Sequence, residues 1–338
     1  MNTNLLITGS YPPDICGVGD YVYNVFNNAD HSKWELYYSK SWDISTFISK
    51  IREINNSGCK CIYMQYPTHG YGWSIVPQLL CLYFSLFTKK KFIVILHEFS
   101  QRKLKAKIAT ALFMFADRII FTNKFEQQYA TKRFLGVKHK SHVVKILSNI
   151  AASENTNNWC SREYDLCYFG LIQPNKGLED FYNTVKQLFG YHKKLRIAII
   201  GQVTPDYSRY FEQLKSTYTD MCVEYKLNQS SEKVSEYLNS TKITYLPFPD
   251  GLSERRGSFL AAISNGSVVV STPGKFLTDD LKSTAIIVDK NYADSVVSQI
   301  LERWTDREYI AYRDKLKKYF MTLPDNWQDI VNKYETIL

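Results

Sequence analysis

YLPFPDGLSERRGSFLAAISNGSVVVST, residues 245–272, contains one complete structural unit. An apolar run ends at Pro247, a loop rich in Gly and Ser carries Arg255 and Arg256, and an apolar stretch of helical length leads to a second apolar run at 268–271. Short apolar runs separated by a helical segment are typical of a β-α-β unit, in which a helix joins two parallel strands. The stretch therefore predicts a parallel sheet covered by helices.

The same alternation of strand-like and helix-like segments continues along the whole chain. In the first half, the predicted strands are Leu5–Gly9, Trp34–Ser39, Cys59–Gln65, Phe92–His97, Arg118–Thr122 and His142–Ile146, with helical segments near 20–27, 44–54, 77–87, 104–115 and 124–134. In the second half, they are Asp165–Phe169, Arg196–Gly201, Cys222–Lys226, Ile243–Pro247, Val268–Ser271 and Ala285–Val288, with helical segments near 177–188, 207–218, 232–239 and 257–264. This order predicts an α/β fold.

The chain is long enough for two domains, because 338 residues exceed the usual size of one compact core. The polar stretch Ala152–Ser161 interrupts the alternation and is the predicted linker. We therefore expect Rossmann-like domains at 1–155 and 156–320 and a C-terminal helix at 321–338. Ligands of such sheets bind outside the carboxyl ends of the strands, so the expected site is a central cleft that both domains face.

Positive charge is concentrated in the first half of the chain. The first 150 residues hold 19 of the 42 Lys and Arg and 9 of the 33 Asp and Glu, so they carry a net +10 and the remainder −1. The basic clusters lie at 89–91, 102–107 and 132–140. They indicate either a solvated basic face or a polyanionic partner. That partner is an anionic lipid surface or a pyrophosphate-linked acceptor; we expect no nucleic acid, because no nucleic-acid motif accompanies the charge.

The sequence predicts neither a metal centre nor a membrane-spanning helix. Cys59 and Cys61 have no second cluster to complete the roughly four ligands of a metal site, and no Asp-x-Asp motif is present. The longest apolar stretch, Ser74–Thr88, is shorter than the roughly 20 residues of a span, so a buried helix or an interfacial helix is expected there. The N-terminus lacks a secretory pattern, and we expect a cytoplasmic protein.

Three loops carry the residue types that bind phosphate. In the first, Gly9–Gly19, glycines let the backbone approach an anion at a helix start, although a tight turn has the same composition. The second ends in Lys176 and Gly177, which place an ammonium group beside free helix amides. The third is the loop at 250–258, whose two arginines have planar guanidinium groups that suit phosphate oxygens.

These loops resemble those of GT-B glycosyltransferases of the family-4 type, in a branch that builds bacterial cell-surface polysaccharides such as O-antigen or capsule. The resemblance covers nearly the whole chain in order. It is carried by YPPDICGVGDY at 11–21, FGLIQPNKG at 169–177 and LPFPDGLSERRGS at 246–258, with Ser148–Ile150 as the segment that crosses between domains and 326–334 as the closing helix.

The resemblance implies the retaining transfer of a hexose-type sugar from a UDP- or GDP-sugar to a glycan, without a metal or other cofactor. For a lipid-linked glycan it implies a peripheral position on the inner face of the membrane. His97 and Lys176 match the family's catalytic positions, and Asp20 and His69 its acceptor-binding region. The implied donor-binding residues are Gly17, Gly19, Lys176, Asp250, Ser253, Arg255, Arg256, Gly257 and Ser258.

The sequence departs from the family pattern at three places. Leu171 stands where the family usually has an arginine, Ser253 and Ala261 occupy the positions of a glutamate pair, and Cys16 replaces a common glycine. We expect the two arginines of the third loop to restore the missing positive charge. Because the lost glutamates bind sugar and ribose, a second function stays open: a catalytically silent sugar-nucleotide-binding partner subunit of another transferase. A third possible function is that of a GT-B sugar-nucleotide epimerase, which the resemblance of the loop at 246–258 to the polysaccharide branch disfavours.

Overall fold

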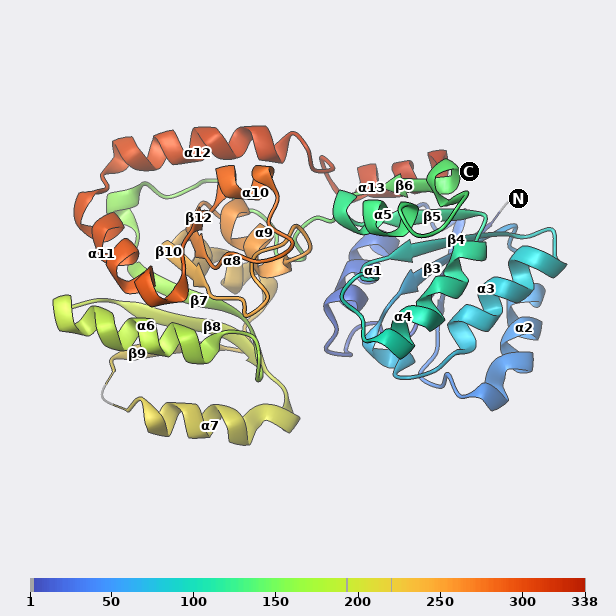
Figure 1. The fold of residues 1–338 in the computed structure, drawn as a ribbon, viewed down its shortest axis with the longest axis horizontal. Coiled ribbons are helices and arrows are strands. Elements are labelled where there is room, and N and C mark those ends of the chain that lie inside the picture. Colours follow the sequence, from blue (N-terminus) through green and yellow to red (C-terminus); the bar gives the residue numbers. More distant parts are fainter. Residues whose placement is uncertain (1–2, 193, 220, 338) are drawn as a thin grey trace. The chain divides into compact units, whose positions relative to one another are not determined.

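The computed structural model describes residues 3–192, 194–219 and 221–337, which form two compact units (Figure 1). The N-terminal unit comprises the chain up to Leu147 together with the segment from Leu323 on, and the C-terminal unit runs from Ser148 to Thr322. Each unit is built around one six-stranded sheet in which all paired strands are parallel. The α/β fold expected from the sequence is confirmed.

The sheet of the N-terminal unit has the strand order β2-β1-β3-β4-β5-β6. Its strands are β1 (Asn4–Thr8), β2 (Trp34–Tyr38), β3 (Cys61–Tyr66), β4 (Lys91–Leu96), β5 (Arg118–Phe121) and β6 (Ser141–Val143). Its helices are α1 (Gly17–Asn27), α2 (Phe47–Asn56), α3 (Val76–Phe87), α4 (Leu104–Ala111), α5 (Lys124–Thr131) and α13 (Trp327–Thr336), with 3₁₀ turns η1 (Ile44–Thr46), η2 (His69–Tyr71), η3 (Leu112–Phe115) and η4 (Val137–Lys140). The strand order reverses between β1 and β3, where such sheets bind ligands.

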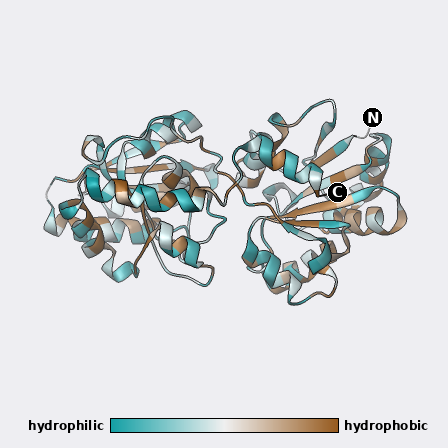
Figure 2. Cartoon of the chain, turned by 90° about the horizontal axis from the view of Figure 1, so that it is seen from above, coloured by the Kyte–Doolittle hydropathy of each residue, from teal (hydrophilic) through white to brown (hydrophobic). Residues whose placement is uncertain are grey.

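Two apolar layers cover this sheet, because successive strand residues point to opposite faces. Figure 2 shows its strands mostly in the hydrophobic colours. On one face Ile7, Met64 and Val94 pack with residues of α2, α3 and η3. On the other face Leu6 and Ile93 pack with residues of α1 and α13. The strands are therefore buried on both sides, as their continuous apolar runs require.

The C-terminal helix α13 belongs to the N-terminal unit, as the resemblance implied. Ile330, Val331 and Tyr334 are buried against the sheet and α1. The Tyr21 and Tyr334 hydroxyls are 2.8 Å apart, and the Tyr63 hydroxyl donates to the backbone oxygen of Tyr334 at 3.2 Å. The chain thus returns to its first unit after completing the second.

The sheet of the C-terminal unit has the strand order β12-β11-β10-β7-β8-β9, which reverses between β7 and β10. Its strands are β7 (Tyr164–Ile172), β8 (Ile197–Val203), β9 (Val223–Leu227), β10 (Thr241–Leu246), β11 (Val268–Ser271) and β12 (Ile286–Ile287). Its helices are α6 (Leu178–Tyr191), α7 (Ser208–Thr217), α8 (Ser231–Asn239), α9 (Gly257–Ser264), α10 (Asp279–Thr284), α11 (Ala293–Arg303) and α12 (Asp306–Phe320), with 3₁₀ turns η5 (Trp159–Ser161), η6 (Pro205–Tyr207) and η7 (Lys290–Tyr292).

The predicted linker at 152–161 is an ordered part of the C-terminal unit, so the units divide earlier than the expected boundary at 155/156. The backbone N–H of Ser153 donates to the side chain of Asn265 at 2.9 Å. The N–H of Asn157 donates to Asn239 at 3.0 Å, and the Asn239 side chain donates back to the oxygen of Asn155. The segment is mostly exposed, and these side-chain and backbone contacts attach it to the C-terminal unit.

Candidate functional site

In the C-terminal unit, the loops after β7 and β10 meet at the reversal of strand order. Gly177 has a φ of +89°, and a Cβ atom added there would lie 2.0 Å from the carbonyl oxygen of Pro247. Only glycine satisfies both conditions. The hydroxyl of Tyr168, a residue in the middle of β7, donates to the backbone oxygen of Lys176 at 3.2 Å. The lysine loop is therefore held directly against the loop that carries the arginines.

The loop after β10 is also joined to the loop after β11. The N–H of Leu252 donates to the oxygen of Thr272 at 3.1 Å, and the Thr272 hydroxyl donates to the oxygen of Phe248 at 2.6 Å. These contacts place Ser253 in a buried position, with 4% of its surface exposed. Its hydroxyl has no hydrogen-bond partner among the described residues, so it is a polar group that a ligand at this loop can satisfy.

The two arginines converge on one carboxylate. Arg256 forms a close ion pair with Asp250, and an Nη atom of Arg255 lies 3.9 Å from the same carboxylate. The Arg256 guanidinium also lies over the Phe248 ring, 4.4 Å from its centroid. Burial and the Glu179 carboxylate raise the pKa of Tyr168, and the nearby Arg256 opposes that rise. The loop therefore holds both guanidinium groups beside the Asp250 carboxylate.

The helices that follow the two loops differ at their N-termini. The first turn of α6 contains Glu179 and Asp180, which are engaged by Tyr210 and, at 3.1 Å, by Lys290. The first turn of α9 contains no acidic residue, and its N-cap, Arg256, makes no side-chain cap hydrogen bond. The free amides of a helix start attract anions, so the start of α9 suits an anion better than the start of α6 does.

The structure thus places Gly177, next to Lys176, against Pro247, where the chain leaves β10 toward the loop 250–258. Gly257 and Ser258 are the first residues of α9, and a Cβ atom on Gly257 would meet nothing within 4 Å. Ala261, at the second lost glutamate position, is fully buried. The buried face of α9 therefore offers no carboxylate for a ribose or a sugar.

In the N-terminal unit, the loops after β1 and β3 are packed together. A Cβ atom on Gly70 would lie 1.5 Å from the oxygen of Gly9, and the N–H of Gly70 donates to the Ser10 hydroxyl at 2.7 Å. The N–H of His69 donates to the sulfur of Cys16 at 3.5 Å. Cys16, at the position where the resemblance implies a glycine, thus holds the His69 loop, while the His69 side chain stays exposed.

The predicted residues of α1 have different environments. Gly17 is exposed at the first position of the helix, and a Cβ atom there would meet nothing within 4 Å. Gly19 is buried, and its missing side chain makes room for the backbone of Ser10 at 3.2 Å. Packing alone explains glycine at this position. Asp20 is half-buried, and burial raises its pKa.

His97 follows β4 and contacts polar and aromatic groups from two other elements, β3 and α1. Its Nε2 is 2.8 Å from the side-chain oxygen of Gln65, which accepts a hydrogen bond in the tautomer that has its proton on Nε2 and leaves Nδ1 as an acceptor. Tyr21 packs edge-on against the imidazole, with the ring centroids 5.1 Å apart. Burial lowers the pKa of His97 to about 3. The side chain is therefore a neutral, oriented imidazole at physiological pH.

Glu126 was not predicted as a site residue, but it holds the loop that follows His97. It is 1% exposed, and its carboxylate accepts the N–H groups of Phe99 and Ser100 at 3.1 and 2.7 Å and the Ser100 hydroxyl at 2.7 Å. Its own N–H is capped by Asn123 at 2.9 Å. The only sequence signal is a glutamate at the third position after a capping Asn, which predicts a local cap rather than this long-range contact.

The lowered pKa of His97 predicts a pH-dependent stability. In the unfolded chain the pKa of histidine is about 6.5, whereas the folded value is about 3. Between these values the unfolded chain binds a proton that the folded chain does not, so stability falls as the pH falls below about 6.5. We expect the contribution of His97 to decrease by about 2 kcal/mol between pH 7 and pH 5. Urea unfolding of wild type and His97→Gln at both pH values tests this, since the variant should lose less stability on acidification. An equal loss in both proteins would contradict it.

Two further searches concern metals and membranes. In the parts of the chain that the structure describes, no group of three or more His, Cys, Asp and Glu side chains is arranged to hold a metal ion. Within the same residues, no helix is both long enough and apolar enough to cross a membrane.

No protein-family model matches the sequence, and no curated protein matches it. Solved structures do match. A UDP-forming α,α-trehalose-phosphate synthase from Burkholderia xenovorans has a TM-score of 0.68 at 10% identity, covering 100% of this chain and 98% of its own. HepE from Anabaena, in complex with UDP and glucose, has a TM-score of 0.63 at 9% identity over 96% and 100%. An α-glucosyltransferase bound to UDP-glucose and DNA has a TM-score of 0.58 at 11% identity over 100% and 99%. The chain therefore has the fold of the GT-B glycosyltransferases.

Proposed function

We propose that the protein is a glycosyltransferase that moves a hexose-type sugar from a nucleotide-sugar donor to a glycan acceptor. The observation that carries this proposal is that the lysine loop packs against the segment leading to the arginine loop, beside the start of α9, whose first turn has no acidic residue. This arrangement lies where the strand order of a Rossmann-like sheet reverses, which is where such sheets bind nucleotides. The GT-B fold makes a nucleotide diphosphate the fitting anion, and HepE, which shares the fold, was solved with UDP and glucose.

The chemistry required of these residues is electrostatic. When the bond between sugar and diphosphate breaks, negative charge grows on the departing phosphate oxygens. Lys176, Arg255 and Arg256 would neutralise that charge, and the free amides of α9 would add hydrogen bonds. The Ser253 hydroxyl would donate to a phosphate or ribose oxygen. None of these contributions needs a metal, and we propose a metal-independent transfer.

The N-terminal unit would supply the acceptor side. A pocket of about 650 Å³ opens beside η2 and is lined by Lys40, Asp43, His69, Tyr71 and Trp73, among others. The Trp73 side chain is 85% exposed, so it presents an aromatic face of the kind on which sugar rings stack. His97, neutral and oriented by Gln65, would hydrogen-bond a sugar or acceptor hydroxyl through Nδ1.

Trp73 provides the test of this acceptor pocket. Because a stacking contact binds substrate and transition state alike, Trp73→Ala should raise the acceptor KM by about three- to tenfold with little change in kcat. Trp73→Phe should restore part of the loss. Initial rates against acceptor concentration measure both, with the fully exposed Leu135 replaced by Ala as the control. A fall in kcat at unchanged KM would argue against an acceptor contact.

The sequence resemblance adds finer elements to the proposal. These are retention of anomeric configuration, UDP or GDP as the nucleotide, and a lipid-linked glycan of a bacterial surface polysaccharide as acceptor. They also include a cytoplasmic protein placed peripherally on the inner face of the membrane. The net charge of +10 in the first 150 residues supports the membrane contact.

One observation favours a second function, a silent sugar-nucleotide-binding partner of another transferase. Ser253 and the buried Ala261 leave α9 without the two carboxylates that the resemblance implies for ribose and sugar. A protein that keeps the diphosphate contacts but lacks sugar contacts would bind nucleotides without turning over the donor.

Nucleotide binding followed by donor turnover distinguishes these functions. Thermal unfolding of wild type and Lys176→Ala is measured with UDP, GDP and ADP, and donor consumption is then measured with the sugar form of the nucleotide that stabilises the protein. We expect one nucleotide to raise the unfolding temperature of the wild type, and we expect the same nucleotide to have no such effect on Lys176→Ala. Turnover would establish a transferase, binding without turnover the silent partner, and no binding at all would contradict both.

A further inference from the structure

A second pocket lies at the amino edge of the N-terminal sheet, opposite the strand ends that carry His69 and His97. It has a volume of about 660 Å³ and is formed where β3, β4 and β5 begin. The charged residues that line it are Lys60, Lys89, Lys90, Lys91, Asp117 and Arg118. Because β4 is six residues long, this pocket is separated from the proposed acceptor edge by about 20 Å.

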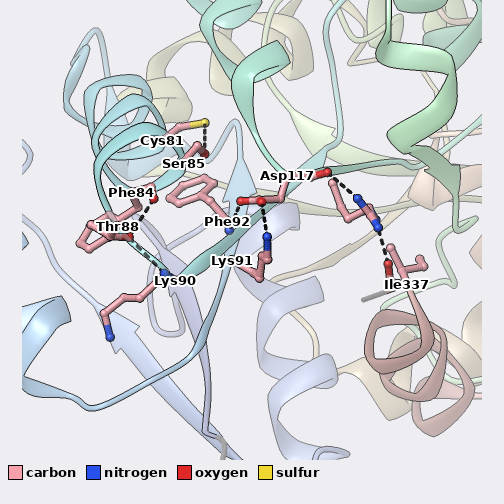
Figure 3. A network of polar contacts seen from close by, with 10 residues as sticks. Cys81, Phe84, Ser85, Thr88, Lys90, Lys91, Phe92, Asp117 and Ile337 are labelled. Atoms are coloured by element: carbon pink, nitrogen blue, oxygen red, sulfur yellow. Dashed lines mark hydrogen bonds and ion pairs between the residues drawn. The ribbon is translucent and has the colours of Figure 1, made fainter.

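Asp117 is the one carboxylate among the described residues that line this pocket, and it is already engaged. It accepts from Lys91 at 3.0 Å and from the N–H of Phe92 at 2.9 Å, as Figure 3 shows. Lys90 points the other way and donates to the backbone oxygen of Cys59. Arg118 donates to the backbone oxygens of Ile337 and Asp117, at 3.2 and 3.0 Å.

Of the contacts described above, only the one between Lys91 and Asp117 pairs a positive charge with a negative one. Backbone oxygens satisfy the hydrogen-bond donors of Arg118 and Lys90 without cancelling their charge. Lys60 and Lys89 extend from exposed positions. Five cations therefore surround one carboxylate, and the pocket presents a surplus of positive charge to any ligand that enters it.

Apolar side chains border the same edge. Helix α3, VPQLLCLYFSLF, contains no charged residue, and its last two side chains, Leu86 and Phe87, are 55% and 76% exposed. They immediately precede Thr88 and the three lysines. Phe115, at the end of η3 and two residues before Asp117, is 52% exposed. Large apolar side chains beside a cationic pocket are typical of surfaces that bind membrane interfaces.

We propose that this edge of the N-terminal unit docks on an anionic lipid bilayer. Lipid phosphates would occupy the lysine pocket, while Leu86, Phe87 and Phe115 enter the boundary between headgroups and acyl chains. A nucleic acid would use the lysines but would leave the exposed apolar side chains in water. The distance from His69 and His97 makes this contact separate from the binding of an acceptor.

This inference develops the membrane contact in the proposed function, but its test requires no sugar transfer, so the two proposals can fail separately. The full-length protein is sedimented with vesicles of phosphatidylcholine containing phosphatidylglycerol and with vesicles of phosphatidylcholine alone, at low and high salt. We expect binding to the anionic vesicles only, weakened by salt. The variants are Lys60→Gln with Lys89→Gln, and separately Phe87→Ser.

The double lysine variant should bind the anionic vesicles roughly 20- to 30-fold more weakly, and Phe87→Ser about tenfold more weakly. Lys315→Gln with Lys318→Gln removes the same charge from exposed positions of α12 and should bind like wild type. Leu135→Ser, at a fully exposed site, is the matched control for Phe87. Thermal unfolding confirms that each variant is folded.

Three results would overturn the proposal. One is wild-type protein that ignores anionic vesicles at low salt. Another is a control pair that weakens binding as much as the lysine pair does. The third is duplex DNA or inorganic phosphate that binds through Lys60 and Lys89 while Phe87→Ser has no effect, which would identify a simple anion site.

Discussion

Arg256→Ala is expected to lower kcat/KM for sugar transfer by about 100- to 1,000-fold, the effect of removing one preorganised charge from a developing oxyanion. Arg256 lies at the start of α9, pairs with Asp250 and is near Tyr168, whose hydroxyl donates to the backbone oxygen of Lys176. Its loss removes a cation and leaves the Asp250 carboxylate facing the departing diphosphate. Initial rates with the nucleotide-sugar that binds, and nucleotide affinity by calorimetry, measure the two effects.

Three companion variants make the result specific. Arg303→Ala removes an exposed arginine at the end of α11 and should change kcat/KM by less than about twofold. Arg256→Lys should recover only part of the activity, because an ammonium group cannot make two parallel hydrogen bonds to phosphate. Asp250→Asn combined with Arg256→Ala should be more active than Arg256→Ala alone. Equal losses for Arg256→Ala and Arg303→Ala would sink the role assigned to the arginine loop.

Tyr334→Ala is expected to destabilise the N-terminal unit by about 3–5 kcal/mol, the usual cost of truncating a large buried aromatic residue. Tyr334 is 1% exposed, contacts Tyr21 through its hydroxyl at 2.8 Å, and stacks on Tyr63 with the ring centroids 6.1 Å apart. Tyr334 belongs to α13, which is distant in sequence from the rest of the unit, so the substitution weakens the packing of this helix against the N-terminal sheet.

Hydrogen exchange of the amides in β1 and β3 localises this effect to the N-terminal unit, and urea unfolding measures its size. Tyr334→Phe removes only the hydroxyl and should cost about 1 kcal/mol. Gln328→Ala, at an exposed position of the same helix, should be neutral within about 0.5 kcal/mol. Unchanged exchange in Tyr334→Ala would show that α13 is not required for the stability of this sheet.

Most of the fold was predictable because its signals are local. The β-α-β alternation, the turn at Gly177 and the arginine loop are each visible within a short window of sequence, and the structure has them at the expected positions. Some boundaries differed. The predicted helix at 104–115 ends at Ala111 and continues as η3, and the helix predicted at 124–134 ends at Thr131. Helices α10, α11 and α12 lay outside the prediction.

The sequence by itself determined the two parallel sheets, the positions of the lysine loop and the arginine loop of the C-terminal unit, and the helix that closes the chain. Hydrophobic periodicity, the placement of glycine and proline, and loop composition act over a few residues. Each therefore predicts local structure without reference to the rest of the chain. Sequence order also implied which strand ends bear glycine, lysine and arginine. These features needed no knowledge of distant contacts.

Only the tertiary structure decided how distant residues are used. It places Glu126 under the loop after His97, uses Cys16 to hold the His69 loop, and attaches the polar segment after Ser148 to the C-terminal unit. It also collects Lys60, Lys89–Lys91 and Arg118 around one pocket. The physical reason is that parallel strands bring loops tens of residues apart to a common edge, where burial and hydrogen bonding act through space and leave no periodic trace in the sequence.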